Sequence, residues 1–147
     1  MIALAGFRFH HFGLAAADPD KAAAFAAKLG YACGPPVFDE KQDVHLRWCE
    51  HTSAPALEIV SPAGPDGPLK NILLGQPSSF YHLCYEIAAD AADALERLRA
   101  DGTRVVTVVP PVPAVLFGGR KVSFHMVRGF GLLELLEPAH PGDGPAP

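Results

Sequence analysis

Positive charge and long apolar runs are both scarce in this sequence. Its 147 residues carry 12 Lys and Arg against 16 Asp and Glu, for a net charge of −4, whereas a nucleic-acid-binding protein normally displays a basic stripe. No apolar run approaches the roughly 18 residues that a membrane-spanning helix needs. The first residues, MIALAGFRFHH, lack the basic start and the cleavage site of a signal peptide. We therefore expect a cytoplasmic protein that binds neither nucleic acid nor membranes.

Cysteine is also rare, because the chain contains only Cys33, Cys49 and Cys84. An odd number at irregular spacing argues against a disulfide framework and against a cysteine-based zinc site. A reducing compartment fits this pattern better. Cys84 stands two residues after His82. We interpret it as a small buried apolar residue, with a Cys–His nucleophilic pair as the alternative.

The composition is that of one folded domain. Apolar residues make up 49% of the chain and charged residues 19%, which is typical of a globular protein rather than a disordered one. A chain of this length can bury a core without disulfides or metals to hold it together. We predict a single domain over residues 1–138, followed by a flexible tail over residues 139–147.

The first half of the chain predicts a strand, a helix and three short strands. FRFHHFGLA alternates as a strand does. One face of this strand would carry Phe7, Phe9, His11 and Gly13. A helix is expected to start after the N-cap Asp18 and to stop at Gly30. Its apolar stripe would consist of Ala22, Phe25, Ala26 and Leu29. Short strands are expected over residues 31–37, 44–49 and 56–60.

The same order of elements returns after a linker rich in Gly and Pro, SPAGPDGPLKNILLGQP. Residues 80–87 predict a strand, and residues 90–100 predict a helix whose inward residues are Ala91, Leu95 and Leu98. Further strands are expected over residues 104–109, 114–127 and 132–136. The chain therefore contains two modules, over residues 7–61 and 79–138, and each has one strand, one helix and three strands.

Four polar residues occupy matching places in the two modules. His11 and His82 lie in the first strand of each module, 71 residues apart, and Glu58 and Glu134 lie in the last strand, 76 residues apart. Imidazole nitrogen and carboxylate oxygen together suit divalent Zn, Ni, Co, Fe or Mn. Each glutamate shares a strand face with apolar neighbours, where an unpaired carboxylate is costly to bury. We therefore predict a divalent metal site formed by His11, Glu58, His82 and Glu134.

Other polar residues have simpler interpretations. Glu137 has the opposite strand parity to Glu134 and is expected to face solvent. The sequence GGRK at residues 118–121 is interpreted as a solvated hairpin turn, with contact to a ligand phosphate or carboxylate as the alternative. A single histidine on a strand is usually a hydrogen-bonded core or surface residue. This interpretation is expected to hold for His10, His45, His51, His125 and His140.

With these residues in place, the chain resembles the vicinal oxygen chelate superfamily, whose members pair βαβββ modules around a metal-holding cleft. The supporting phrases are HHFGLAAADPDKAAAFAAKLGY, LEIVSPAGPDGPLKNIL, FYHLCYEI and GLLELLEP. The chain looks most like the methylmalonyl-CoA epimerase branch. Bacterial glyoxalase I is the neighbouring comparison, and its His, Glu, His, Glu ligand set matches the four residues above. The resemblance implies an α+β fold in which the modules pair into a glyoxalase/bleomycin-resistance-like incomplete barrel.

The resemblance also implies an activity. The expected protein is a metal-dependent isomerase or epimerase that abstracts a proton next to a metal-polarised carbonyl, with Glu134 and Glu58 as catalytic carboxylates. It implies a small-molecule substrate, with acyl-CoA compounds as candidates, and a homodimer. The strand VHLRWC departs from the pattern, since it has no carboxylate where some epimerases place a second base.

Three alternatives use the same scaffold. A glyoxalase I-type lyase would use the same four ligands. An Fe(II) dioxygenase would use His11, His82 and Glu134 as a facial triad, but a fourth ligand at Glu58 argues against it because oxygen chemistry needs open positions. A resistance-type protein that only binds a small molecule would be expected to lack an intact ligand set, whereas this sequence has all four.

Overall fold

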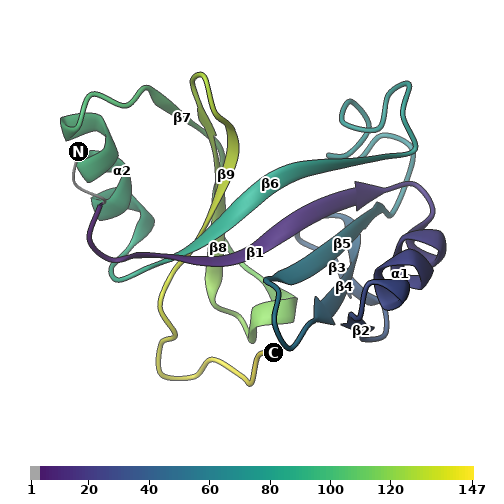
Figure 1. The fold of residues 1–147 in the computed structure, drawn as a ribbon. Coiled ribbons are helices and arrows are strands. Elements are labelled where there is room, and N and C mark those ends of the chain that lie inside the picture. The colour runs from purple at the N-terminus through teal and green to yellow at the C-terminus, as the bar shows by residue number, and fades with distance from the viewer. Residues whose placement is uncertain (1–3) are drawn as a thin grey trace.

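The computed structural model describes residues 4–147, so the first three residues of the predicted domain lie outside it. Its two modules follow one another along the chain (Figure 1). The first consists of β1 (Phe7–Ala16), α1 (Pro19–Lys28), β2 (Ala32–Cys33), β3 (Val37–Asp39), β4 (Val44–Glu50) and β5 (Ala56–Pro62). The second consists of β6 (Ser78–Ile87), α2 (Ala91–Ala100), β7 (Val105–Pro113), the 3₁₀ turn η1 (Val115–Phe117), β8 (Lys121–Val127) and β9 (Gly131–Leu136).

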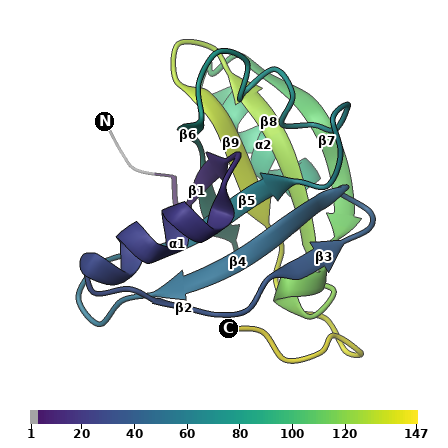
Figure 2. The same ribbon diagram turned by 90° about the vertical axis from the view of Figure 1, so that its right-hand side faces the viewer.

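A single curled sheet joins the two modules. The strand order in the described residues is β2-β4-β5-β1-β6-β9-β8-β7, and β3 pairs with β4 off this path. Each module pairs its first strand with its last in parallel, and the antiparallel β1–β6 pair connects the modules. Figures 1 and 2 show the sheet curling into an open half-barrel, with α1 on the first module and α2 on the second. The predicted α+β fold of two βαβββ modules is confirmed.

Aspartate side chains cap both helices: Asp18 as predicted, and Asp90, which was expected to be the first residue of the second helix. The side chains of Asp18 and Asp90 accept hydrogen bonds from the amides of Lys21 (3.1 Å) and Asp93 (2.8 Å), which pairs amides that a helix start otherwise leaves free. The chain leaves α1 through Gly30, whose φ of 95° suits glycine. Within residues 4–147, neither helix is long and apolar enough to span a bilayer.

The buried face of α1 differs from the predicted stripe. The helix packs on the sheet through Ala23 and Ala26, whereas Phe25 is 61% exposed and Leu29 is 58% exposed. Small alanine side chains let the helix axis lie close to the sheet. The two large residues instead line an open groove of about 1150 Å³ between α1 and the neighbouring ends of β6 and β9. The prediction that Phe25 and Leu29 face the core is wrong.

The expected strand over residues 31–37 is interrupted by Gly34-Pro35-Pro36, which leaves the two short strands β2 and β3. Cys33 in β2 lies opposite Cys49 in β4, and the two form a disulfide. This corrects the expectation that the cysteines do not form a disulfide. Sequence spacing does not reveal the pair, because it depends on the register between two strands. Cys84 is free and buried.

Glu137, expected to face solvent, is only 5% exposed. It follows the last residue of β9, and its Oε1 accepts a hydrogen bond of 3.0 Å from the backbone amide of Ala91. The start of α2 therefore lies against this carboxylate, which satisfies one of the first helical amides and suits the positive end of the helix dipole. The alternation of strand faces does not predict the burial of Glu137, because β9 ends at Leu136 and the alternation does not extend beyond it.

Candidate metal centre

The four predicted ligands lie on the four central strands of the sheet. His11 is on β1, Glu58 on β5, His82 on β6 and Glu134 on β9. All four residues are buried, with exposures between 0% and 4%. One ligand atom of each residue lies within 4.8 Å of those of the others. The fold thus gathers into one cluster all the residues that the sequence proposes as metal ligands.

Strand register explains why these side chains meet. Gly13 on β1 is paired with both Glu58 on β5 and His82 on β6, so these two ligands flank it in one row across the sheet. In the next row Cys84 is flanked in the same way by the other two ligands. Gly13 and Cys84 are themselves 71 residues apart, so the two rows are related by the repeat.

The distances within the cluster fit a divalent cation. Oε2 of Glu134 lies 3.0 Å from Nε2 of His82 and 3.1 Å from Nε2 of His11, and the two nitrogens are 3.4 Å apart. Bonds of about 2.0–2.2 Å to a metal place neighbouring ligands roughly 3.0–3.5 Å apart. Despite the short contacts, Oε2 of Glu134 has no partner in hydrogen-bond geometry among residues 4–147. An unpartnered buried carboxylate oxygen facing two imidazole nitrogens is suited to a cation.

Glu58 lies slightly apart from this trio. Its Oε1 is 3.8 Å from Nε2 of both His11 and His82. The longer distance makes Glu58 the more loosely associated of the two carboxylates. A cation held by this set would have two imidazole and two carboxylate ligands, which is a donor set that Zn, Ni, Co, Fe and Mn accept.

Burial and mutual charge separate the pKa values of the two carboxylates. Burial raises the pKa of Glu58 to about 7, and the negative charge of Glu134 adds to this. Burial alone would also raise the pKa of Glu134, but the charge of His82 and the contact with His11 lower it. For His11, burial would lower the pKa, but the contact with Glu134 and the charge of Glu58 raise it.

Aromatic side chains enclose the histidine on β1. The ring centroid of His11 lies 5.2 Å from that of Trp48 on β4 and 5.6 Å from that of Phe117 on η1. Trp48 donates from its Nε1 to Oε1 of Glu50 at 3.2 Å. β4 thus places the indole of Trp48, rather than a carboxylate, beside the cluster.

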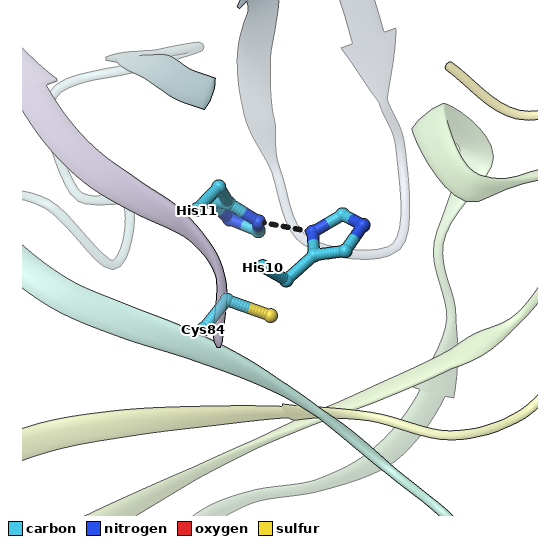
Figure 3. A group of neighbouring side chains, drawn as sticks. All are labelled: His10, His11 and Cys84. Carbon is cyan, nitrogen blue, oxygen red and sulfur yellow. Dashed lines mark hydrogen bonds between the residues drawn. The ribbon is translucent and has the colours of Figure 1, made fainter. Parts of the chain in front are cut away.

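His10 was expected to be an ordinary core or surface residue, yet it contacts the cluster. The register of the β1–β6 pair shifts between Phe9 and His11, which leaves His10 as the extra residue of a β-bulge. Its Nδ1 lies 2.8 Å from Nδ1 of His11 (Figure 3). Phe9 packs against Phe12 with ring centroids 4.9 Å apart. Simple alternation, which had grouped Phe9 with His11, cannot anticipate a bulge.

Cys84 lies beside His10 and His11, fully buried (Figure 3). Burial raises the pKa of its thiol well above the usual value, and the charge of Glu134 adds to the effect. A thiol that stays protonated is a weak nucleophile. The structure thus agrees with the interpretation of Cys84 as a small buried residue.

Comparison with known families identifies the fold. The family model of the Glyoxalase/Bleomycin resistance protein/Dioxygenase superfamily matches residues 10–124. The chain belongs to this superfamily. The predicted membership of the vicinal oxygen chelate group, the name used above for the same superfamily, is therefore confirmed. A comparison with curated protein sequences finds no match.

Solved structures of vicinal oxygen chelate proteins share the fold across nearly the whole chain. Methylmalonyl-CoA epimerase from Mycobacterium tuberculosis has a TM-score of 0.75 and 20% identity, over 95% of this chain and 94% of that one. A variant of the Streptomyces coelicolor epimerase in complex with 2-nitronate-propionyl-CoA gives 0.71 and 24%, over 92% and 100%. A hypothetical protein from Bacillus halodurans gives 0.72 and 15%, over 94% and 99%.

Proposed function

We propose that this protein is a divalent-metal-dependent isomerase of the epimerase type, which moves a proton at a carbon next to a carbonyl. One observation carries the proposal: His11, Glu58, His82 and Glu134 converge in one buried cluster. The superfamily membership and the likeness to epimerase structures support it. A bound Co, Ni, Zn, Mn or Fe(II) ion would polarise a substrate carbonyl and so acidify the neighbouring C–H.

The roles of the residues follow from their positions. His11, His82 and Glu134 form the tight part of the cluster, with contacts of 3.0–3.4 Å, and we assign them to holding the metal. Glu58, at 3.8 Å from both imidazoles, completes the ligand set as the looser member. Epimerisation requires proton removal on one face and return on the other, hence two bases or one mobile base. Glu58 and Glu134, from opposite modules, are the proposed pair.

The walls of the cluster support proton transfer. Trp48 and Phe117 cover the ring of His11 with apolar surface, and the ligands themselves are almost inaccessible. Excluding water lowers the local dielectric constant, so a cation held by the ligand set would attract a developing negative charge on the substrate more strongly.

The proposed substrate is a 2-substituted carbonyl compound, with an acyl-CoA thioester as the first choice. This choice rests on the relatives: one epimerase structure holds 2-nitronate-propionyl-CoA, and another holds methylmalonyl-CoA and NH4+. The homodimer and the cytoplasmic location remain predictions of the sequence analysis.

A glyoxalase I-type lyase is the second candidate, and Trp48 favours it. Some epimerases place a second base on the strand where this protein has Trp48 beside His11. The one carboxylate of this strand, that of Glu50 at its end, is exposed and accepts a hydrogen bond from Trp48. With an indole beside His11, the two glutamates of the ligand set would have to do all of the proton transfer. The hemithioacetal of methylglyoxal and glutathione is the substrate that separates this candidate from an epimerase.

Exchange of the substrate α-proton tests the proposal. Metal-loaded wild type is expected to exchange the α-proton of methylmalonyl-CoA in deuterium oxide, followed by proton NMR. Glu134→Gln, which keeps an oxygen ligand but removes a base, is expected to abolish the exchange, and Glu96→Gln on the exposed face of α2 serves as the control. Near-normal exchange by Glu134→Gln with its metal retained would contradict the assigned role. Turnover of the hemithioacetal alone would favour the lyase.

A further inference from the structure

We infer that His10 is a positioning residue, which orients the ligand ring of His11 by accepting a hydrogen bond from its Nδ1. This inference rests on the proposed function, because it concerns how the protein presents His11 to a metal. Three features of the structure lead to it: a bulge, a contact, and an asymmetry between the modules. The direction of the hydrogen bond then follows from the nitrogen that would bind the metal.

The bulge brings two consecutive imidazoles together. Phe9 is paired with Tyr85 and His11 with Cys84, so no residue on β6 is left to face His10. In a regular strand neighbouring side chains point to opposite faces, whereas an extra residue in one strand re-aims its side chain. His10 and His11 therefore face each other instead of diverging (Figure 3).

The ring of His10 is held by its surroundings. Its centroid lies 5.5 Å from that of Trp48 and 5.4 Å from that of Phe117, and the residue is half-buried. Its Nδ1 lies 2.8 Å from Nδ1 of His11, within hydrogen-bond distance. A ring packed in this way can fix the orientation of its neighbour.

Only one direction of this hydrogen bond is compatible with a metal. Nε2 of His11 faces Oε2 of Glu134 at 3.1 Å and Nε2 of His82 at 3.4 Å, so Nε2 is the nitrogen that would bind a cation. A neutral imidazole that binds through Nε2 carries its proton on Nδ1. His11 must then donate and His10 must accept. In the reverse arrangement the proton of His11 would sit on Nε2 and block the site.

The second module lacks this arrangement. Tyr81 precedes His82 as His10 precedes His11, and it is also an extra residue, because Gly13 pairs with His82 and Leu14 with Phe80. Its ring meets that of His82 edge-on, with centroids 4.5 Å apart. Yet Nδ1 of His82 has no hydrogen-bond partner among the described residues. Metal-binding histidines are commonly oriented by a partner on the second nitrogen, and in this protein His11 has one.

Cobalt affinity in three variants provides the test. His10→Phe keeps a ring but removes the acceptor, and it is expected to weaken Co(II) binding about 10- to 100-fold, measured by competition with a chelator. His10→Asn places an amide oxygen near the position of Nδ1 and is expected to restore most of the affinity. Tyr81→Phe, at the equivalent position of the other module, is expected to bind Co(II) as wild type does. Should His10→Phe fail to fold, His10→Leu, which matches Asn in shape, replaces it.

The outcomes separate this inference from the proposed function. In wild type loaded with Zn, ¹⁵N NMR is expected to show a protonated Nδ1 on His11. Wild type that binds no Co(II) would contradict the proposed metal site itself. Wild type that binds Co(II) no more tightly than His10→Phe would overturn only the role of His10. Equal losses in His10→Phe and His10→Asn would also overturn it, because ring packing rather than hydrogen bonding would then be responsible.

Discussion

Gly13 lies opposite His82 across the β1–β6 pair, and a methyl group on Gly13 would lie 2.0 Å from Cε1 of the imidazole. No real Cβ approaches a heavy atom so closely, so the ring of His82 occupies the space that any other residue at position 13 would fill. Cys84, the equivalent position in the second module, retains a side chain opposite His11. The two modules thus accommodate their ligand histidines differently.

Gly13→Ala is therefore expected to displace His82 and to weaken Co(II) binding by at least about 10-fold, since a misplaced ligand loses the converged geometry. Cys84→Ala, which removes a side-chain atom at the equivalent position instead of adding one, is the matched control and is expected to retain binding. Chelator competition on the two variants measures the difference. Wild-type affinity in Gly13→Ala would show that the ring of His82 can move aside without weakening metal binding.

The apo protein is expected to lose stability, relative to Glu58→Gln, as pH rises from about 5 to 8. The pKa of Glu58 is raised from 4.5 to about 7 and that of His11 is raised above 6.5 in the folded state. Both groups therefore hold protons more firmly when folded, so each contributes stability that falls with rising pH. Burial lowers the pKa values of His10 and His125 to about 4, so these two groups contribute stability that rises with pH, and the comparison with Glu58→Gln removes their effect. The Glu58 contribution, on the order of 3 kcal/mol, would disappear between pH 4.5 and 7. Urea unfolding of chelator-treated protein measures this slope.

Two controls accompany the pH series. Glu58→Gln cannot ionise at this position, so below pH 7 its stability should fall less, or rise more, with pH than that of wild type. Metal loading should add stability that grows with pH, because a cation binds the deprotonated ligands. The same pH dependence in wild type and in Glu58→Gln would contradict the raised pKa of Glu58.

Local sequence signals were sufficient for the framework of the fold. Asp18 caps its helix in the structure as predicted, and the second helix begins within one residue of its predicted start, because helix starts depend on residues within one turn. The repeated His and Glu positions anticipated which residues meet, because each module pairs its first strand with its last and the two first strands pair with each other. Whether those residues bind metal remains a prediction.

Features that depend on distant register escaped sequence reasoning. The bulge that turns His10 toward His11 breaks the alternation from which strand faces are predicted. Glu137 is buried because the start of α2 packs against it, and its carboxylate accepts a hydrogen bond from the amide of Ala91. The Cys33–Cys49 disulfide requires a pairing of β2 with β4 that no local pattern specifies. In each case the deciding contact joins elements whose relative position only the folded chain determines.

The disulfide can be counted directly. Denatured protein prepared without reductant is expected to show one titratable thiol, that of Cys84, and reduced protein is expected to show three. Cys33→Ser is expected to cost about 3 kcal/mol of unfolding free energy, since closing a loop of this size restricts the unfolded chain. Three thiols without reductant would show that the bond does not form, and the original expectation of unpaired cysteines would stand.

Glu137→Ala is expected to destabilise the fold by about 1–3 kcal/mol, because it leaves the buried amide of Ala91 without its acceptor. Glu96→Ala, on the exposed face of the same helix, is the matched control and should change stability by less than about 0.5 kcal/mol. Thermal unfolding compares the two. Equal effects would mean that the carboxylate of Glu137 does not stabilise the start of α2.

Metal content is the most direct test of the central claim, that His11, Glu58, His82 and Glu134 form one metal site. Chelator-stripped protein would be reconstituted separately with Co, Ni, Zn, Mn and Fe(II), desalted, and analysed beside His82→Ala. Wild type is expected to retain about one equivalent per chain of at least one of these metals, and His82→Ala is expected to retain none. No specific uptake by wild type, or equal uptake by His82→Ala, would contradict it.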